Sequence, residues 1–197
     1  MKTVNVSLVG VGGQGILLTA NMLAKAASLA GLDVKKSEIH GMAQRGGSVV
    51  SQVRIGKEVH SPIIPEGATD ILVAFDKLEA LRWAHVLAKG GKAVVNALYL
   101  TPVTVSSGQQ REPEDLDGSL KKAIKAMNLV DAVGLSREAG NERAMNMVIA
   151  GALSALFPLD VKYWEAAMDA TFVGPKAKLL ELNKKAFALG RASVAKA

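Results

Sequence analysis

A glycine-rich run near the start of the chain has the spacing of an anion-binding turn. It reads Gly10-Val11-Gly12-Gly13-Gln14-Gly15 and directly follows an apolar segment. In this pattern the first glycine permits a tight turn, the second lets a ligand approach the backbone, and the third lets a helix pack on its strand. The free N–H groups at the start of that helix attract phosphate or carboxylate. The candidate ligand-binding residues are Gly10, Gly12, Gly13, Gln14 and Gly15.

Glycines that merely pack a strand against a helix would give the same pattern, and this interpretation stays open. A dinucleotide site also needs an acidic residue about 20 positions further on, at the end of the second strand. Glu38 comes somewhat late for that role, and neither Lys35 nor Lys36 clearly replaces it.

A second polar loop carries the other candidate residues. Residues 40–48 read HGMAQRGGS and follow a predicted strand at its carboxyl end, where open α/β sheets bind ligands. An imidazole, an amide and a guanidinium can together hold an anion or a planar carbonyl group, while glycines allow another backbone to approach. The candidates for an active-site entrance or an interface are Glu38, His40, Gln44, Arg45, Gly46, Gly47 and Ser48. A solvent-exposed loop held by its own hydrogen bonds is the alternative.

The composition argues against a cofactor in this chain. It contains no cysteine and three histidines, whereas thiolates are the usual ligands of iron–sulfur clusters and structural zinc. We therefore expect neither a metal nor a cofactor here. No G-x-S-x-G elbow or paired carboxylates point to nucleophilic catalysis, so no catalytic residue is assigned.

The net charge of +6 comes mostly from the end of the chain, where six basic residues follow position 175 against one glutamate. With two Trp, two Tyr and four Phe, the chain lacks aromatic residues for stacking bases, so this segment is predicted to be a solvated amphipathic helix. No signal peptide is recognisable, and no apolar run reaches the about 20 residues of a membrane span. We expect a cytoplasmic protein that binds neither nucleic acid nor membranes.

Apolar periodicity predicts alternating strands and helices. The predicted strands cover residues 3–9, 33–39, 48–55, 70–75, 92–98, 103–105 and 129–133. The predicted helices cover residues 14–30, 76–88, 113–128, 136–157, 161–170 and the segment from 175 onward. A turn at Gly56-Lys57 is expected to join 48–55 to residues 58–61 in a hairpin. The fold class is α/β: a Rossmann-like three-layer sandwich with a mostly parallel sheet, an inserted β-hairpin and a helical C-terminal region, in a single domain over 1–197.

The two glycine-containing segments, in this order and spacing, resemble the gamma-type domain of the pyruvate/2-oxoacid:ferredoxin oxidoreductases. Ser61-Pro62-Ile63-Ile64-Pro65-Glu66-Gly67 and Gly90-Gly91-Lys92-Ala93-Val94-Val95-Asn96 fit the same family. The resemblance is strongest over residues 4–96. Within the family, the chain is most similar to the small (beta) subunits of the indolepyruvate enzymes.

This resemblance implies a subunit that is not active alone. The complete complex oxidatively decarboxylates aryl pyruvates with coenzyme A as co-substrate, and gives aryl-acetyl-CoA, carbon dioxide and reduced ferredoxin. A large (alpha) subunit carries thiamine diphosphate, magnesium and iron–sulfur clusters, which agrees with the cysteine-free composition. The 40–48 loop is then expected to dock on the large subunit and help shape the substrate or coenzyme A channel.

Two other functions compete with this one. A stand-alone NAD(P)-binding Rossmann oxidoreductase would account for the glycine turn. The lack of a well-placed acidic residue after the second strand and the predicted hairpin that follows both count against it. A purely structural assembly subunit would use the small residues of 136–157, which let another helix approach closely. Whether the isolated chain is monomeric or forms a homodimer through that helix stays open.

Overall fold

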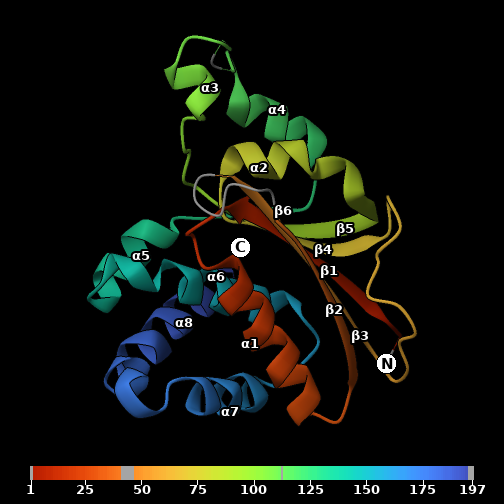
Figure 1. The fold of residues 1–197 in the computed structure, drawn as a ribbon, viewed down its shortest axis with the longest axis vertical. Helices are drawn as coiled ribbons and strands as arrows, with labels where there is room; N and C mark the ends of the chain where they lie inside the picture. Colours follow the sequence, from red (N-terminus) through yellow and green to blue (C-terminus); the bar gives the residue numbers. More distant parts are fainter. Residues whose placement is uncertain (1, 41–46, 112, 195–197) are drawn as a thin grey trace.

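The computed structural model describes residues 2–40, 47–111 and 113–194. These form one six-stranded sheet of order β2-β3-β1-β4-β5-β6, with helices on both faces (Figure 1). The strands are β1 (Val4–Val11), β2 (Asp33–His40), β3 (Ser48–Gly56), β4 (Thr69–Ala74), β5 (Leu87–Asn96) and β6 (Met127–Val130). The helices are α1 (Ile16–Leu29), α2 (Lys77–Arg82), α3 (Val103–Ser106), α4 (Leu116–Ala123), α5 (Ala132–Ala139), α6 (Met145–Leu156), α7 (Val161–Thr171) and α8 (Leu180–Val194), with 3-10 turns η1 (Ala84–Val86), η2 (Glu142–Ala144) and η3 (Gly174–Leu179).

The sheet is parallel except around β3. Strands β1, β4, β5 and β6 run parallel, while β3 lies antiparallel between β1 and β2. The α/β class and the helical C-terminal region are confirmed. β2, however, lies at the edge of the sheet and not beside β1.

The hairpin prediction was right about β3 and wrong about its partner. β3 pairs with the preceding β2, with Asp33 opposite Gly56. Residues 58–61 form no strand, because side chains hold this segment in place of a backbone ladder. The Asp33 carboxylate accepts a hydrogen bond from Val59 N over 2.8 Å, and Arg54 Nη1 donates to Ser61 O over 3.0 Å.

Alternating side chains of the strands build two cores on opposite faces. Val6 and Leu8 face a core shared with α1, α6, α7 and α8, while Val9 faces a smaller core under α2 and α4. Figure 1 shows these two groups of helices on opposite sides of the sheet. The predicted three layers are therefore present.

The predicted helix over 136–157 is divided in two. Gly140 ends α5 with φ +117°, a left-handed conformation that suits glycine, and Asn141 starts the next turn by accepting a hydrogen bond from Arg143 N. The small residues beyond this break act as predicted, since they bring α8 close to α6. A Cβ added at Gly151 would lie 2.8 Å from Arg191 N, and one at Gly190 would lie 2.8 Å from Val148 Cα.

Three further local predictions were wrong. Residues 103–105 belong to α3, because Pro102 O accepts hydrogen bonds from Val105 N and Ser106 N, each over 3.0 Å. The helix predicted over 76–88 ends at Arg82, and β5 already begins at Leu87. The predicted strand 129–133 stops at Val130, since the Asp131 carboxylate caps α5 by accepting from Gly134 N. Within the described ranges, no helix has both the length and the apolar character needed to cross a bilayer.

Candidate functional site

The glycine turn joins β1 to α1 at the carboxyl edge of the sheet. Gly13 and Gly15 have φ values of +106° and +87°, which favour glycine. A Cβ on Gly15 would lie 2.8 Å from the Asn146 side chain, and one on Gly10 would lie 2.8 Å from Phe75 Cβ. Three of the predicted glycines are therefore required by backbone conformation or by packing. α1 starts without a side-chain cap, so the first N–H groups of the helix remain suited to an anion.

Gln14 braces this turn. Its Oε1 accepts a hydrogen bond from Val11 N over 2.7 Å, and its Nε2 donates to Phe75 O over 3.0 Å. The same carbonyl accepts from Asn96 Nδ2 over 3.2 Å. Because both ends of its amide are bound to backbone, Gln14 is better suited to position the turn than to hold a ligand.

The two predicted motifs meet through their backbones. Gly12 N donates to Gly47 O over 2.8 Å, which fastens the end of the second loop to the glycine turn. His40 pairs through its backbone position with Val49. Gln44, Arg45 and Gly46 lie outside the described residues.

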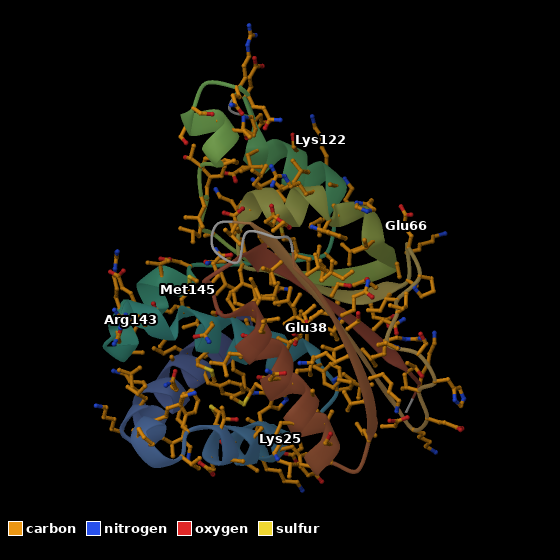
Figure 2. The ribbon with its side chains drawn as sticks, in the orientation of Figure 1. Lys25, Glu38, Glu66, Lys122, Arg143 and Met145 are labelled. Carbon is orange, nitrogen blue, oxygen red and sulfur yellow. The ribbon has the colours of Figure 1, made fainter. Side chains whose placement is uncertain are left out.

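The side chains of the second motif do not form one cluster. Glu38 lies on the α1 face of the sheet, where it forms an ion pair with Lys36 (Figure 2). Ser48 lies on the opposite face, where its Oγ donates to Glu79 Oε2 over 2.6 Å. The alternation of the strands separates these two candidates, although only the loop lies between them in sequence.

Around Ser48 lies a cluster that sequence reasoning missed as a site. Glu79 is 2% exposed and also accepts a hydrogen bond from Arg82 Nη1 over 2.6 Å. Asp76 and Glu79 have the spacing of a capping box, and Asp76 fulfils the first half of that pattern by accepting from Leu78 N and Glu79 N. Glu79 instead turns to Ser48 and Arg82, a contact that no local pattern reveals because Ser48 is 31 residues away.

Asp76 is the buried acid at the start of α2. It is 1% exposed, and its Oδ2 accepts a further hydrogen bond from Leu100 N over 2.7 Å. Burial raises the pKa of Asp76 above its ordinary range, although its three backbone N–H partners act in the opposite direction. Asp76 thereby ties α2 to the loop that follows β5.

A cavity of about 460 Å³ opens beside this cluster, at the carboxyl ends of β1 and β4. Its polar lining includes Ser48, Glu79, Arg82, Thr101 and Thr104. The Arg82 side chain is 48% exposed, so its remaining N–H groups and the Thr101 hydroxyl are suited to a carboxylate or phosphate group, whereas the Thr104 hydroxyl already donates to Gln110 Oε1 over 2.8 Å. Among the described residues, no group of three or more His, Cys, Asp or Glu is placed to hold a metal ion.

The fold and sequence have clear relatives. The family model of the pyruvate ferredoxin/flavodoxin oxidoreductases matches residues 5–193. The indolepyruvate oxidoreductase subunit IorB of Archaeoglobus fulgidus is 40% identical over 190 residues, which cover 94% of this chain and 92% of the relative. The subunit of the same name from Pyrococcus horikoshii is 41% identical over 195 residues, covering 96% and 95%.

Two solved structures share the fold. The gamma subunit of a keto/oxoacid ferredoxin oxidoreductase from Geobacter sulfurreducens has a TM-score of 0.73 at 24% identity, with 98% of this chain and 99% of that chain covered. A 2-oxoglutarate:ferredoxin oxidoreductase from Magnetococcus marinus has a TM-score of 0.74 at 23% identity, and the match covers 100% of this chain and 32% of that longer chain. The match to the family model over nearly the whole chain and the identity to two full-length relatives agree with the resemblance noted in the sequence. This chain belongs to the pyruvate ferredoxin/flavodoxin oxidoreductase family.

Proposed function

We propose that this chain is the small subunit of a 2-oxoacid:ferredoxin oxidoreductase that acts on indolepyruvate and related aryl pyruvates. The complex cleaves the bond between the carboxylate and the keto carbon, releases carbon dioxide, transfers the acyl group to the thiol of coenzyme A, and passes the electrons to ferredoxin. The observation that carries this proposal is the 40% and 41% sequence identity to two IorB subunits over nearly the full length of the chain. In this proposal residues 1–197 act as one domain.

The chemistry falls to a larger partner subunit. Thiamine diphosphate, magnesium and iron–sulfur clusters are assigned to that partner, since a chain without cysteine offers no thiolate for a cluster. The solved structure from Magnetococcus marinus is consistent with a role as one part of a larger enzyme, because the fold of this chain matches 32% of a chain of an oxidoreductase that has 2-oxoglutarate, coenzyme A and succinyl-CoA bound. In that protein the fold is one part of a longer polypeptide.

This chain contributes the carboxyl edge of its sheet to the complex. The loop over 40–48 docks against the large subunit near its active-site entrance, and the cavity beside Arg82 forms part of the wall of the substrate or coenzyme A channel. The support is geometric: the loop is fastened at Gly47, and the exposed guanidinium of Arg82 is fixed by the buried carboxylate of Glu79. A fixed cation of this kind orients an anionic substrate.

The test is co-expression with candidate large subunits, followed by indolepyruvate-dependent viologen reduction in the presence of coenzyme A. Activity that requires both chains supports the proposal, whereas full activity of the large subunit alone contradicts it. Within the active complex, Arg45→Ala and Arg82→Ala each raise the KM for the 2-oxoacid or for coenzyme A. Lys122→Ala on α4, away from this edge, is the control and leaves KM unchanged (Figure 2).

The glycine turn favours one competing function, a stand-alone nicotinamide-dependent enzyme. The position of Glu38 counts against it. β3 lies between β2 and β1, so β2 is two strand spacings, about 10 Å, away from the strand that leads into the glycine turn. Glu38 on β2 is also paired with Lys36. Binding of NAD or NADP by the isolated chain, measured by calorimetry, would support this alternative, and its absence would leave the subunit function standing.

A further inference from the structure

The outer edge of β2 presents backbone groups to solvent, and their direction follows from the strand alternation. Phe75 N donates to Val9 O over 2.9 Å, and Gly12 N donates to Gly47 O over 2.8 Å. Successive residues of a strand direct their N–H and C=O groups to opposite sides. Odd-numbered residues of β1 therefore bond towards β4, and even-numbered residues bond towards β3.

The pairing register determines in the same way which residues of β3 and β2 bond to each neighbouring strand. Odd-numbered residues of β3 bond to β1 and even-numbered residues to β2, where Gln52 lies opposite Ser37. In β2 the odd-numbered residues thus bond inward, and Lys36 and Glu38 direct their N–H and C=O groups outward. These backbone groups have no hydrogen-bond partner among the residues that the structure describes. Such an edge is a template for another strand.

The sequence of β2 is self-complementary in one antiparallel register. A two-fold axis through Ser37 places Lys36 opposite Glu38 of a second copy, and Glu38 opposite Lys36 of that copy. Opposite charges directly across two strands stabilise the pairing, and like charges destabilise it. The adjacent register, centred on Lys36, would bring two lysines together. We propose that this edge binds β2 of a second copy of this chain in the register centred on Ser37.

The helix beside β2 is consistent with this contact. α1 runs alongside β2 (Figure 1), and Lys36 Nζ bonds to Asn21 Oδ1 of the helix. By helical spacing Leu17 and Ser28 share the face of Asn21, and all three are exposed. When two sheets join at a strand spacing of about 4.8 Å, the two copies of α1 lie side by side and cover Leu17.

This pairing goes beyond the proposed function and does not depend on it. The two β2 strands run in opposite directions, so the carboxyl edges of the two copies point away from each other. Each copy keeps its candidate site. The small residues of α6, in contrast, offer no surface to a second copy, because Gly151 already packs against the backbone of α8.

Charge reversal tests the register. Lys36→Glu and Glu38→Lys each place like charges across the two-fold, so each variant alone dimerises at least about tenfold more weakly than the parent. An equimolar mixture of the two variants restores the dimer, because both cross-strand pairs are then opposite in charge. Both variants have lost the pair between Lys36 and Glu38 within the chain, so recovery on mixing cannot come from that pair.

Light scattering after gel filtration measures the mass of the parent, of each variant and of the mixture. A monomeric parent at about 100 µM, dimeric single variants, or a mixture that stays monomeric would each overturn the proposal.

A single thiol tests the axis. The chain has no cysteine, so Ser37→Cys carries the only one. Across the axis the two Cα atoms lie about 4.5 Å apart, a separation that a disulfide can span. Mild oxidation converts this variant to a covalent dimer. Leu129→Cys, 51% exposed in the other edge strand β6, is the matched control and stays monomeric. Equal cross-linking of the two variants contradicts the assigned edge.

Discussion

Gly151 lies where α6 and α8 cross with their backbones in contact, and replacing it by alanine measures how much stability this crossing contributes. A Cβ at this position would lie 2.8 Å from both Phe187 C and Arg191 N, and still closer to the Phe187 carbonyl oxygen. Ordinary carbon contacts are about 3.5 Å, so the helices must separate by roughly 1 Å. The colliding atoms belong to backbone and not to a flexible side chain, so no change of rotamer relieves them.

Two effects of the substitution oppose each other. Overpacking costs about 3 kcal/mol, the upper part of its usual range, and alanine returns about 1 kcal/mol of helix propensity. The net loss is about 2 kcal/mol, which lowers Tm by about 4–8 °C in a protein of this size. Urea unfolding and differential scanning calorimetry measure both quantities.

The control is Gly134→Ala in α5, where the nearest neighbour of the new Cβ is the carboxylate of Asp131. That carboxylate can turn away at the cost of a cap worth about 1 kcal/mol, so the net change is close to zero. A Gly151→Ala protein as stable as the parent would refute the reasoning, because propensity would then outweigh the backbone contact.

Three further predictions concern the carboxyl edge. Gln14→Ala removes the hydrogen bonds with Val11 N and Phe75 O and leaves a part-buried backbone N–H without its acceptor. The free energy of unfolding, measured by urea titration, therefore falls by about 1–3 kcal/mol. An unchanged value would contradict the role of Gln14 in bracing the turn. Glu79→Gln removes the charge that holds Arg82, so it lowers the free energy of unfolding by about 1–3 kcal/mol at neutral pH. A double-mutant cycle with Arg82→Met that shows no coupling energy would contradict a stabilising ion pair between the two residues. Asp76 has a raised pKa in the folded protein, so its carboxyl favours folding at pH values below the ordinary pKa of about 3.9 and loses that contribution as the pH rises through the folded value. The unfolding free energy of the parent therefore declines relative to Asp76→Asn as the pH rises through the acid range, and the opposite trend in paired urea titrations would show that the backbone N–H donors dominate.

Local sequence pattern was sufficient where neighbours in the chain are also neighbours in space. The apolar run of β1, the glycines of the turn and the periodicity of α1 agree with the structure within two residues at each end. The position of β3 could not be obtained in this way. Its alternation identifies a strand, but whether the strand pairs with residues 33–40 or with 58–61 depends on Asp33, which binds the backbone of Val59 from 26 residues away.

In the candidate site, too, the sequence predicted the features that depend on neighbouring residues and missed those that depend on residues far away in the chain. The glycines were recognised because their conformations depend on their own backbone. Glu79 was not recognised, because its place in the site depends on a contact with Ser48, which lies on a strand far away in the sequence. In its own helix, Glu79 is already explained by the spacing of a capping box. Glu38 and Ser48 appeared to belong to one loop, yet strand alternation places them on opposite faces.

The hydrogen bonds of the carboxyl edge join elements that no single segment could hold together. Gln14 connects β1 to the end of β4, Asn96 connects the end of β5 to the same carbonyl, and Asp76 connects α2 to Leu100. Ser48 and Glu79 connect β3 to α2. Because each bond bridges two elements, the carboxyl edge forms a rigid frame around the cavity, and such a frame loses little conformational entropy when another protein binds. In the proposed function, this edge presents a preorganised surface to the larger subunit to which the chemistry is assigned.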